Sequence, residues 1–302
     1  MEKSITLEQH LKDADSGIKE LILLIAKNSR KINKAFETQY GYTCTKNSYG
    51  ETQIALDKYA DQLLIKEFEK SKLVRTVASE EQDEIIEIIK TKGEFGITLD
   101  PLDGSGCINT NLSVGTIAGI FNEGNVMEKG NKMDAACYVL YGPITSFVYS
   151  AKNGLHEFLM NSKGKFILKK ENILIPEGKI YSPGGLRKDY FPKHKKLIEE
   201  LEKEGFKLRF SGSFAADFNQ ILYYGGIFTY PAVKTQPQGK LRLLFEANPM
   251  SFLIKEAGGD SSNGYEKILN IKPEALNQRT PLYLGTKKLI KKTEKIFRRN
   301  NK

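Results

Sequence analysis

The stretch Asp100-Pro-Leu-Asp-Gly-Ser105 constrains this chain more than any other. It follows the apolar run Gly96–Leu99, which we interpret as a buried strand that ends where Pro101 fixes φ and bends the backbone. Gly104 permits a tight turn whose N–H groups can face an anion. Carboxylates beside exposed N–H groups suit divalent-metal and phosphate chemistry, although the same residues also fit a turn in which both aspartates cap local N–H groups.

Helical and strand patterns alternate along the chain, which predicts a layered α/β protein. Helical spacing of apolar residues follows Ser16 and recurs across Leu56–Phe68, and β-rich runs follow from residue 73 onward. Residues 40–50 are rich in Gly, Thr, Ser and Asn, so we expect a polar loop there. The pattern changes near residue 172, and we divide the chain into two α/β halves, 1–171 and 172–302.

Composition excludes several classes of protein. The 302 residues are 40% hydrophobic and 27% charged, which is typical of a globular protein. Because no apolar run approaches the roughly 20 residues of a membrane span and no secretory signal is evident, we expect a cytoplasmic protein without a membrane partner. Three cysteines without paired spacing, Cys44, Cys107 and Cys137, agree with a reducing compartment.

The net charge of +9 is concentrated at one end of the chain. The last sixteen residues carry eight Lys or Arg against the single acid Glu294, so the remainder is close to neutral. Apolar residues recur there at helical spacing, from Leu289 to Phe297. We interpret this segment as a terminal helix with a solvated basic face, with an acidic partner as the alternative, and we expect no nucleic-acid partner.

Carboxylates collect where predicted elements end. Glu80 and Glu81 close one strand, and the two aspartates of Asp100–Asp103 close another; parallel strands in one sheet would bring all four together. Further acids lie before, on and at the start of predicted helices: Glu51, Asp57 and Glu246. Because such a cluster repels itself, it favours a hard cation such as Mg²⁺ or Mn²⁺, although acidic pairs are also common on surfaces. Zinc held by histidine is not expected, because the three histidines are scattered in the sequence: His10, His156 and His194.

Taken together, these segments resemble class I fructose-1,6-bisphosphatases. The likeness runs from about Gly50 to Gly285, and the D-P-x-D-G-S motif is shared with inositol monophosphatase-like enzymes. A second run, Lys240-Leu-Arg-Leu-Leu-Phe-Glu-Ala-Asn-Pro-Met250, is far more specific to the bisphosphatases. The other matching segments are Ser79–Glu81, Leu112–Ile117, Tyr224–Pro231 and Glu256–Gly259.

The resemblance implies a layered αβαβα sugar-phosphatase fold, with two mixed sheets sandwiched by helices. It implies hydrolysis of the 1-phosphate of fructose 1,6-bisphosphate in gluconeogenesis, by a homotetramer that uses Mg²⁺, with Mn²⁺ or Zn²⁺ as possible substitutes. Sedoheptulose-1,7-bisphosphatase, a dual sugar bisphosphatase and an inositol monophosphatase-like enzyme are the alternatives within enzymes. A basic scaffold that has lost catalysis is the alternative from another class.

The resemblance also implies roles for particular residues. The metal ligands would be Glu80, Glu81, Asp100, the carbonyl of Leu102, Asp103 and Glu246. Asp57 and Glu81 would help to activate water, with Glu51 and Arg242 as further catalytic residues. The 1-phosphate would be bound by Asp103, Gly104 and Ser105, and the sugar would lie along Ser213 and Phe214. The 6-phosphate would meet Gly184, Arg187, Tyr230 and Lys240, with Arg209 reaching it from a neighbouring subunit.

Several positions depart from the family pattern. Gly106-Cys107-Ile108-Asn109 stands where Ser-Asn-Ile-Asp is usual, which removes a hydroxyl near the 1-phosphate. Three contacts of the 6-phosphate are altered at Gly184, Arg187 and Phe210, and we expect the Arg187 guanidinium to compensate. Glu94-Phe95 stands where a Lys-Tyr pair is expected to bind AMP, so we predict weak or no inhibition by AMP.

Overall fold

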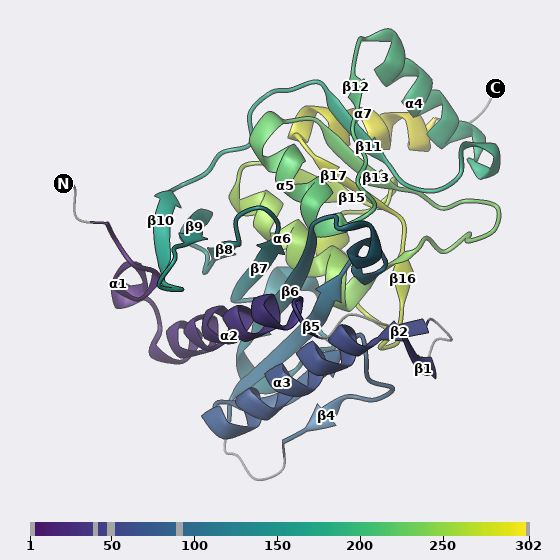
Figure 1. Ribbon diagram of the computed structural model, residues 1–302. Coiled ribbons are helices and arrows are strands. Elements are labelled where there is room, and N and C mark those ends of the chain that lie inside the picture. Colours follow the sequence, from purple (N-terminus) through teal and green to yellow (C-terminus); the bar gives the residue numbers. More distant parts are fainter. Residues whose placement is uncertain (1–3, 39–41, 47–51, 89–92, 300–302) are drawn as a thin grey trace.

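The computed structural model describes residues 4–38, 42–46, 52–88 and 93–299 (Figure 1). Helices and two mixed sheets alternate in five layers, which confirms the predicted layered α/β fold. Helices α1 and α2 precede the strands of the larger sheet in the chain, and α5 and α6 lie between the two sheets. The helices are α1 (Leu7–His10), α2 (Ser16–Ala35), α3 (Ala55–Ser71), α4 (Pro192–Lys203), α5 (Phe214–Tyr224), α6 (Asn248–Glu256) and α7 (Lys287–Arg298).

The larger sheet has eight strands in the order β10-β9-β8-β7-β6-β5-β3-β4. Only β3 and β5 run parallel, and the other neighbours are antiparallel. Every residue of β5 and β6 is buried, because helices or loops cover both faces of the sheet there. The strands are β3 (Val74–Ser79), β4 (Ile86–Glu87), β5 (Phe95–Asp103), β6 (Val114–Phe121), β7 (Ala135–Tyr141), β8 (Ser146–Ser150), β9 (His156–Met160) and β10 (Phe166–Lys170).

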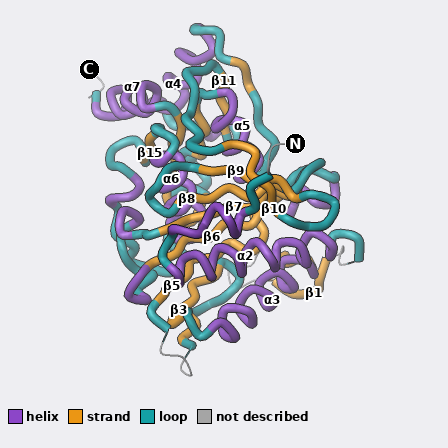
Figure 2. Tube along the Cα trace, turned by 90° about the vertical axis from the view of Figure 1, so that its left-hand side faces the viewer, coloured by secondary structure: helices purple, strands orange, loops and turns teal. Residues whose placement is uncertain are grey.

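Helices α2 and α3 cover one face of this sheet and lie side by side (Figures 1 and 2). Asp15 caps α2 by accepting hydrogen bonds from the N–H groups of Gly17 and Ile18. Apolar residues of both helices, such as Leu21 and Phe68, pack in one core with strand residues. This packing holds the start of α3 against the sheet, where it contributes one wall of the site described below.

The second sheet has five strands in the order β12-β11-β13-β17-β15. Helices α5 and α6 fill the layer between the sheets, where Phe218 and Leu253 pack with Tyr138 of β7 and Phe228 of β13. The strands are β11 (Ile180–Pro183), β12 (Lys207–Leu208), β13 (Ile227–Tyr230), β15 (Asp260–Ser262) and β17 (Leu282–Gly285). Two short pairs complete the strands: β1 (Tyr42–Lys46) with β2 (Thr52–Ile54), and β14 (Leu241–Arg242) with β16 (Arg279–Thr280).

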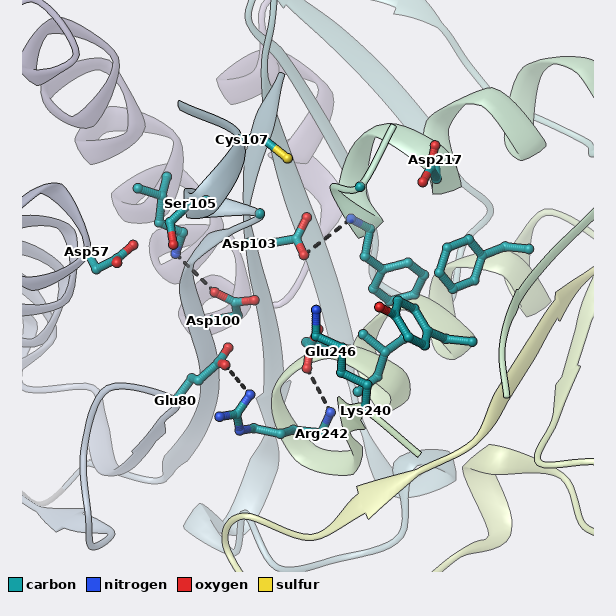
Figure 3. Close-up of a pocket in the computed structure, with 18 of the residues that line it drawn as sticks. Asp57, Glu80, Asp100, Asp103, Ser105, Cys107, Asp217, Lys240, Arg242 and Glu246 are labelled. Carbon is teal, nitrogen blue, oxygen red and sulfur yellow. Dashed lines mark hydrogen bonds and ion pairs between the residues drawn. The ribbon is translucent and has the colours of Figure 1, made fainter. Parts of the chain in front are cut away.

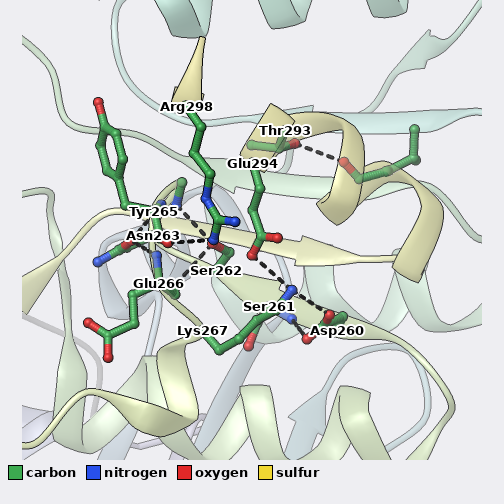
Figure 4. A network of polar contacts seen from close by, with 12 residues as sticks. Asp260, Ser261, Ser262, Asn263, Tyr265, Glu266, Lys267, Thr293, Glu294 and Arg298 are labelled. Atoms are coloured by element: carbon green, nitrogen blue, oxygen red, sulfur yellow. Dashed lines mark hydrogen bonds and ion pairs between the residues drawn. The ribbon is translucent and has the colours of Figure 1, made fainter. Parts of the chain in front are cut away.

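Helices α4 and α7 form the outer layer on the second sheet. The inner face of α7 is apolar, and Lys267 bridges Asp260 of β15 (2.7 Å) and Glu294 of α7 (2.8 Å) (Figure 4). Arg298 donates to the carbonyl of Tyr265. Four lysines on the outer side of α7 are exposed: Lys287, Lys288, Lys291 and Lys295. The basic segment is therefore a docked helix with a solvated basic face, as expected.

Two expectations about local structure are wrong. Residues 42–46 form strand β1 within the stretch expected to be a polar loop, because Thr and Tyr favour strands even among polar neighbours. The strand expected to end at Asp100 continues through Pro101 to Asp103, with an irregular register against β6. A proline fits there because the irregularity interrupts the ladder of hydrogen bonds. No helix of the described ranges is long and apolar enough to cross a membrane.

Candidate active site

The site begins where the parallel strands β3 and β5 end. Ser79 pairs with Leu99, and the N–H of Glu80 donates to the carbonyl of Leu99 over 3.0 Å. The residues that follow, Glu80 and Asp100, therefore lie side by side where the pairing of β3 with β5 ends. This is the arrangement that the sequence predicted for two strands lying parallel in one sheet.

The register of β5 against β6 is irregular between Asp100 and Asp103, and both carboxylates point into the same space. The Asp100 carboxylate accepts a hydrogen bond from the N–H of Leu102 (3.0 Å), and the Thr116 hydroxyl donates to the carbonyl of Pro101 (2.8 Å). These contacts fix the backbone between the aspartates. Figure 3 shows the carboxylates of Asp100 and Asp103 lying toward the same cavity.

Asp103 lies at the N-terminus of α5. Its carboxylate accepts from the N–H of Ala215 (2.7 Å), the hydroxyl of Ser213 (2.9 Å) and the N–H of Phe214 (3.3 Å). The next residue, Gly104, has φ +75°, and a Cβ there would lie 2.6 Å from Cβ of Ser213. Glycine is therefore required for the close approach of this turn to α5.

The third carboxylate of the site belongs to a residue in the second half of the chain. Glu246 lies in a short π-helix (Leu243–Ala247) that precedes α6, and its carboxylate accepts from the N–H of Arg242 over 2.7 Å. The guanidinium of Arg242 pairs with Glu80 at 2.5 Å, and only 5% of the Arg242 side chain is exposed. Arg242 thus joins the end of β3 to the π-helix (Figure 3).

We call Asp100, Asp103 and Glu246 the carboxylate cluster. An oxygen of each lies within 4.8 Å of an oxygen of the other two, and all three residues are buried. Burial raises the pKa of Asp100 and of Glu246 well above their usual values, and the charge of Glu80 adds to both shifts. Burial also raises the pKa of Asp103 to about 6, against the lowering effect of its three hydrogen bonds. Oxygen ligands at this spacing could hold a metal ion, which would remove the repulsion.

The carboxylate cluster lines a cavity of about 400 Å³. The same cavity is lined by Lys240, Tyr230 and Phe210: the Lys240 ammonium lies 5.4 Å from the centre of the Tyr230 ring, and Phe210 meets that ring edge-on. A Cβ at Gly184 would lie 2.6 Å from the Tyr230 ring, so glycine leaves room for that ring. The cavity therefore combines carboxylates suited to cations with an ammonium and aromatic rings suited to an anionic group.

The comparisons with known proteins agree with this geometry. Residues 2–171 match the N-terminal domain of fructose-1-6-bisphosphatase, and residues 174–298 match its C-terminal domain. This chain belongs to the fructose-1,6-bisphosphatase family. The family assignment confirms the resemblance read from the sequence motifs.

Three curated relatives are named fructose-1,6-bisphosphatase class 1. The protein of Methanospirillum hungatei is 46% identical over 279 residues, covering 92% of this chain and 90% of the relative. That of Methanocorpusculum labreanum is 45% identical, covering 96% and 91%, and that of Pelobacter propionicus is 47% identical, covering 93% and 89%. The similarity therefore spans both halves of the chain.

Solved structures support the same fold. The fructose-1,6-bisphosphatase of Leishmania major in its holo form has a TM-score of 0.92 and 30% identity, covering 98% of this chain and 99% of that chain. The T-state structure of that protein has a TM-score of 0.88 with the same identity and coverage.

Most residues suggested by the family resemblance lie around the cavity. These are Asp57, Glu80, Glu81, Asp100, Leu102, Asp103, Gly104, Ser105, Phe214, Tyr230, Lys240, Arg242 and Glu246. Ser213 does not line the cavity itself, but its hydroxyl donates a hydrogen bond to Asp103, which does. Glu51 lies outside the described residues. The individual roles of all these residues stay predictions.

Two predicted residues lie away from the cavity. The guanidinium of Arg187 binds Glu202 through two contacts of 2.8 and 3.4 Å, and more than half of the side chain is exposed. The structure does not bring Arg187 to the cavity where it was expected to compensate for lost contacts. Arg209 lies over the ring of Tyr224 and contacts Gln220, so its predicted reach toward a neighbouring subunit stays a prediction.

Sequence reasoning missed two buried aspartates. Asp217 of α5 lines the cavity and accepts from the N–H of Ser211 (2.8 Å). Asp61, one turn after Asp57 on α3, accepts from the hydroxyl of Ser79 (2.6 Å) and the amide of Gln82 (2.5 Å). It thereby ties down both ends of the segment that carries Glu80 and Glu81. The one-turn spacing on α3 was the available signal for Asp61.

Two of the three histidines, although scattered in the sequence, lie together in space. His10 and His156 have ring centres 4.5 Å apart, although they are 146 positions apart in sequence. Their proximity depends on the packing of α1 against the far edge of the large sheet, which local sequence patterns do not specify. His194 lies elsewhere, on α4.

Proposed function

We propose that this chain hydrolyses the 1-phosphate of fructose 1,6-bisphosphate, which yields fructose 6-phosphate and inorganic phosphate. The observation that carries the proposal is a single cavity lined both by the carboxylate cluster and by Lys240 with Tyr230. A sugar with two phosphates needs both kinds of group, one for reaction and one for orientation. The shared name of the curated relatives supports the same substrate.

We further propose Mg²⁺ as the metal, with Mn²⁺ as a substitute. Its ligands would come from Glu80, Glu81, the carbonyl of Leu102 and the carboxylate cluster. The donor set fits, because every proposed ligand atom is an oxygen, as hard cations prefer. Three buried carboxylates within 4.8 Å of one another also need a cation to offset their repulsion.

When bound, Mg²⁺ would activate water and neutralise charge on the phosphoryl oxygens. The protein supplies the remaining parts. Asp57 and Glu81 line the cavity beside the metal ligands and would accept the proton of the attacking water. Ser105, in the turn after Gly104, would donate to the 1-phosphate. Arg242 holds Glu80 in place through their ion pair.

At the far end of the sugar, Lys240 and Tyr230 would orient the 6-phosphate. An ammonium and a phenol give strong, charge-assisted hydrogen bonds to a phosphate. Because Arg187 binds Glu202 instead, the contacts at this end are fewer than the sequence suggested. This observation keeps sedoheptulose 1,7-bisphosphate as a second substrate candidate, since a less crowded end could accept a longer sugar.

The test is phosphate release with Mg²⁺ from fructose 1,6-bisphosphate, sedoheptulose 1,7-bisphosphate and an inositol monophosphate, for the native chain and for Asp100→Asn. We expect the highest kcat/KM on fructose 1,6-bisphosphate and loss of activity in the variant. A preference for the seven-carbon sugar would replace the substrate assignment. Activity that survives Asp100→Asn would break the metal assignment, and no phosphate release at all would favour a non-catalytic protein.

Five further proposals rest on family membership. We propose a homotetramer in which Arg209 reaches the neighbouring site, a role in gluconeogenesis, a cytoplasmic location, and division of the chain into functional halves at about residue 172. We also propose weak or no AMP inhibition, since Glu94 is exposed and acidic at the start of β5. Sedimentation analysis and assays with added AMP would test the first and last of these.

A further inference from the structure

A second cluster of potential metal ligands lies at the opposite end of the large sheet. His10 ends α1, His156 begins β9, and Glu171 directly follows β10. Strands β9 and β10 are antiparallel neighbours at the sheet edge, so His156 and Glu171 lie close together. We call these three residues the imidazole cluster.

The first helix is fixed against this edge by its backbone. The N–H of Leu168 in β10 donates to the carbonyl of Ile5 over 2.8 Å, and Thr6 forms a bridge with Ile167. Thr6 and Gln9 also cap the helix reciprocally. The position of His10 is therefore set by main-chain contacts, as a ligand position requires.

The donor atoms have spacings that a metal ion can use. Nε2 of His10 lies 3.2 Å from Oε1 of Glu171, and donor atoms of all three residues lie within 4.8 Å of one another. Tetrahedral bonds of about 2.0–2.1 Å place neighbouring ligand atoms about 3.3 Å apart. The distance between His10 Nε2 and Glu171 Oε1 already matches this spacing. The half-exposed Glu171 side chain can move to bring the remaining distances between ligand atoms to the same value.

The second nitrogen of each imidazole has a partner that suits metal binding. Nδ1 of His10 lies 2.6 Å from the hydroxyl of Tyr149, and Nε2 of His156 lies 3.2 Å from the carbonyl of Asn153. Because a carbonyl oxygen only accepts hydrogen bonds, His156 carries its proton on Nε2. Its Nδ1 then has a lone pair that is available to a metal. The N–H of Asn172 reaches that Nδ1 at only 3.4 Å, a long contact that a metal would replace. Metal-binding histidines typically engage their other nitrogen in this way.

We propose that His10, His156 and Glu171 bind one transition-metal ion of the Zn²⁺ type, at a site separate from the catalytic cavity. Two imidazoles and one carboxylate match the donors that Zn²⁺ prefers, whereas Mg²⁺ prefers oxygen alone. The cluster borders a second cavity, of about 670 Å³, through which an ion and its water can enter. Burial, followed by the neighbouring imidazole of His10, lowers the pKa of His156, which favours the neutral ring that binds a metal.

A bound ion would join three segments that are far apart in sequence. It would tie α1 to β9 and β10, so its chemical effect is to fasten the N-terminal helix to the sheet. The alternative is that His10 and Glu171 form an ordinary ion pair and bind no metal. Such a pair is partly exposed and would contribute little stability.

The test uses the full chain in excess Mg²⁺, the metal proposed for the carboxylate cluster, and titrates Co²⁺ and Zn²⁺. Two variants remove ligands: His10→Phe keeps the ring that contacts Phe158, and Glu171→Gln changes an exposed side chain. Glu8→Gln is the matched control, because Glu8 is an exposed carboxylate on the same helix. The readouts are bound metal per chain, the visible Co²⁺ spectrum and the Zn²⁺-dependent rise in Tm.

We expect one additional ion per chain, a Co²⁺ spectrum typical of four-coordinate nitrogen and oxygen ligands, and a rise in Tm with Zn²⁺. Both ligand variants should weaken this binding by at least about 100-fold, and Glu8→Gln should leave it unchanged. Equal metal binding in the native chain and all three variants would overturn the proposal. So would the absence of a Co²⁺ spectrum and of any rise in Tm, and neither readout depends on catalysis.

Discussion

The carboxylate cluster and the imidazole cluster occupy opposite ends of one sheet and use different chemistry. The carboxylate cluster lies where parallel strands β3 and β5 end, and all its members are buried. The imidazole cluster lies at the β9–β10 edge and includes an exposed carboxylate. The first concentrates negative charge in the interior, whereas the second has a single acid beside two imidazoles.

This difference predicts how each cluster behaves without a metal. Buried like charges are costly, so the carboxylate cluster destabilises the apoprotein and depends on a cation. The imidazole cluster already forms hydrogen bonds and an ion pair, so it can persist without metal. A cluster that is strained without a cation suits catalysis, and one that is satisfied either way suits an accessory site.

The largest expected effect is at the carboxylate cluster. Glu246→Gln should lower kcat/KM by about 10³-fold, about 4 kcal/mol, because a charged ligand of the proposed metal is lost. In EDTA the same variant should unfold at an equal or higher Tm, since one buried negative charge is removed. Phosphate release and thermal unfolding measure the two effects, with Glu8→Gln as a surface control. A variant that is less stable in EDTA and fully active in Mg²⁺ would contradict this description.

The second effect is expected at Lys240, which lines the same cavity. Lys240→Ala should raise KM by about 10- to 100-fold with a smaller change in kcat, because a charge-assisted hydrogen bond to the far phosphate is lost. The comparison is made with fructose 1-phosphate, which lacks the far phosphate and should respond little to the substitution. If both substrates lose activity equally, Lys240 acts at the reacting end instead.

Much of the carboxylate cluster could be predicted from the sequence. The acids follow apolar runs at strand ends, and parallel strands bring their ends to one edge of a sheet, so Glu80 and Asp100 were expected together. The π-helix that delivers Glu246 and the three donors that hold Asp103 were not evident. They depend on how α5 and α6 pack between the sheets, which is a tertiary property.

The imidazole cluster could not be predicted in this way. Its members come from a four-residue helix, the start of one strand and the residue after another. No regular spacing in the sequence relates these three residues. They are brought together by docking of the N-terminal segment on β10, where the N–H of Leu168 donates to the carbonyl of Ile5. Strand β10 was also missed, since its Lys-rich end resembles a polar loop. Local patterns therefore indicate sites at strand ends better than sites made by docking of a terminal segment.

The third histidine, which is buried, provides a reference for the other two. His194 on α4 contacts Tyr283 through Nδ1, and burial lowers its pKa to about 3. In the unfolded chain its pKa is about 6.5, so below that pH the unfolded state binds a proton that the folded state does not. Stability should therefore fall as the pH drops from 6.5 toward 3, by about 2 kcal/mol at pH 5.

Urea unfolding at pH 7.5 and pH 5 measures this effect in the native chain and in His194→Gln, which keeps a polar partner for Tyr283. The variant should lose about 2 kcal/mol less than the native chain between the two pH values. An equal loss would mean that other groups cause the acid sensitivity. Zn²⁺ should leave this difference unchanged, because the imidazole cluster does not include His194.

The smallest expected effect concerns two glycines in the turn of the catalytic cavity. A Cβ at Gly104 would meet Ser213 at 2.6 Å, whereas a Cβ at Gly106 would have no heavy atom within 4 Å. Gly106→Ser should therefore fold normally and place a hydroxyl near the 1-phosphate. One added hydrogen bond should raise kcat/KM by about 2- to 10-fold.

Gly106→Ala separates the hydroxyl from the loss of backbone freedom, since both substitutions restrict the chain but only serine can donate. If alanine gives the same gain, the improvement comes from a more rigid turn, and the 1-phosphate is held by backbone N–H groups alone. If serine lowers kcat/KM while alanine leaves it unchanged, the added hydroxyl interferes at the reacting end. A gain confined to serine would place the 1-phosphate beside Gly106, within reach of the carboxylate cluster, and so fix the direction in which the sugar lies in the cavity.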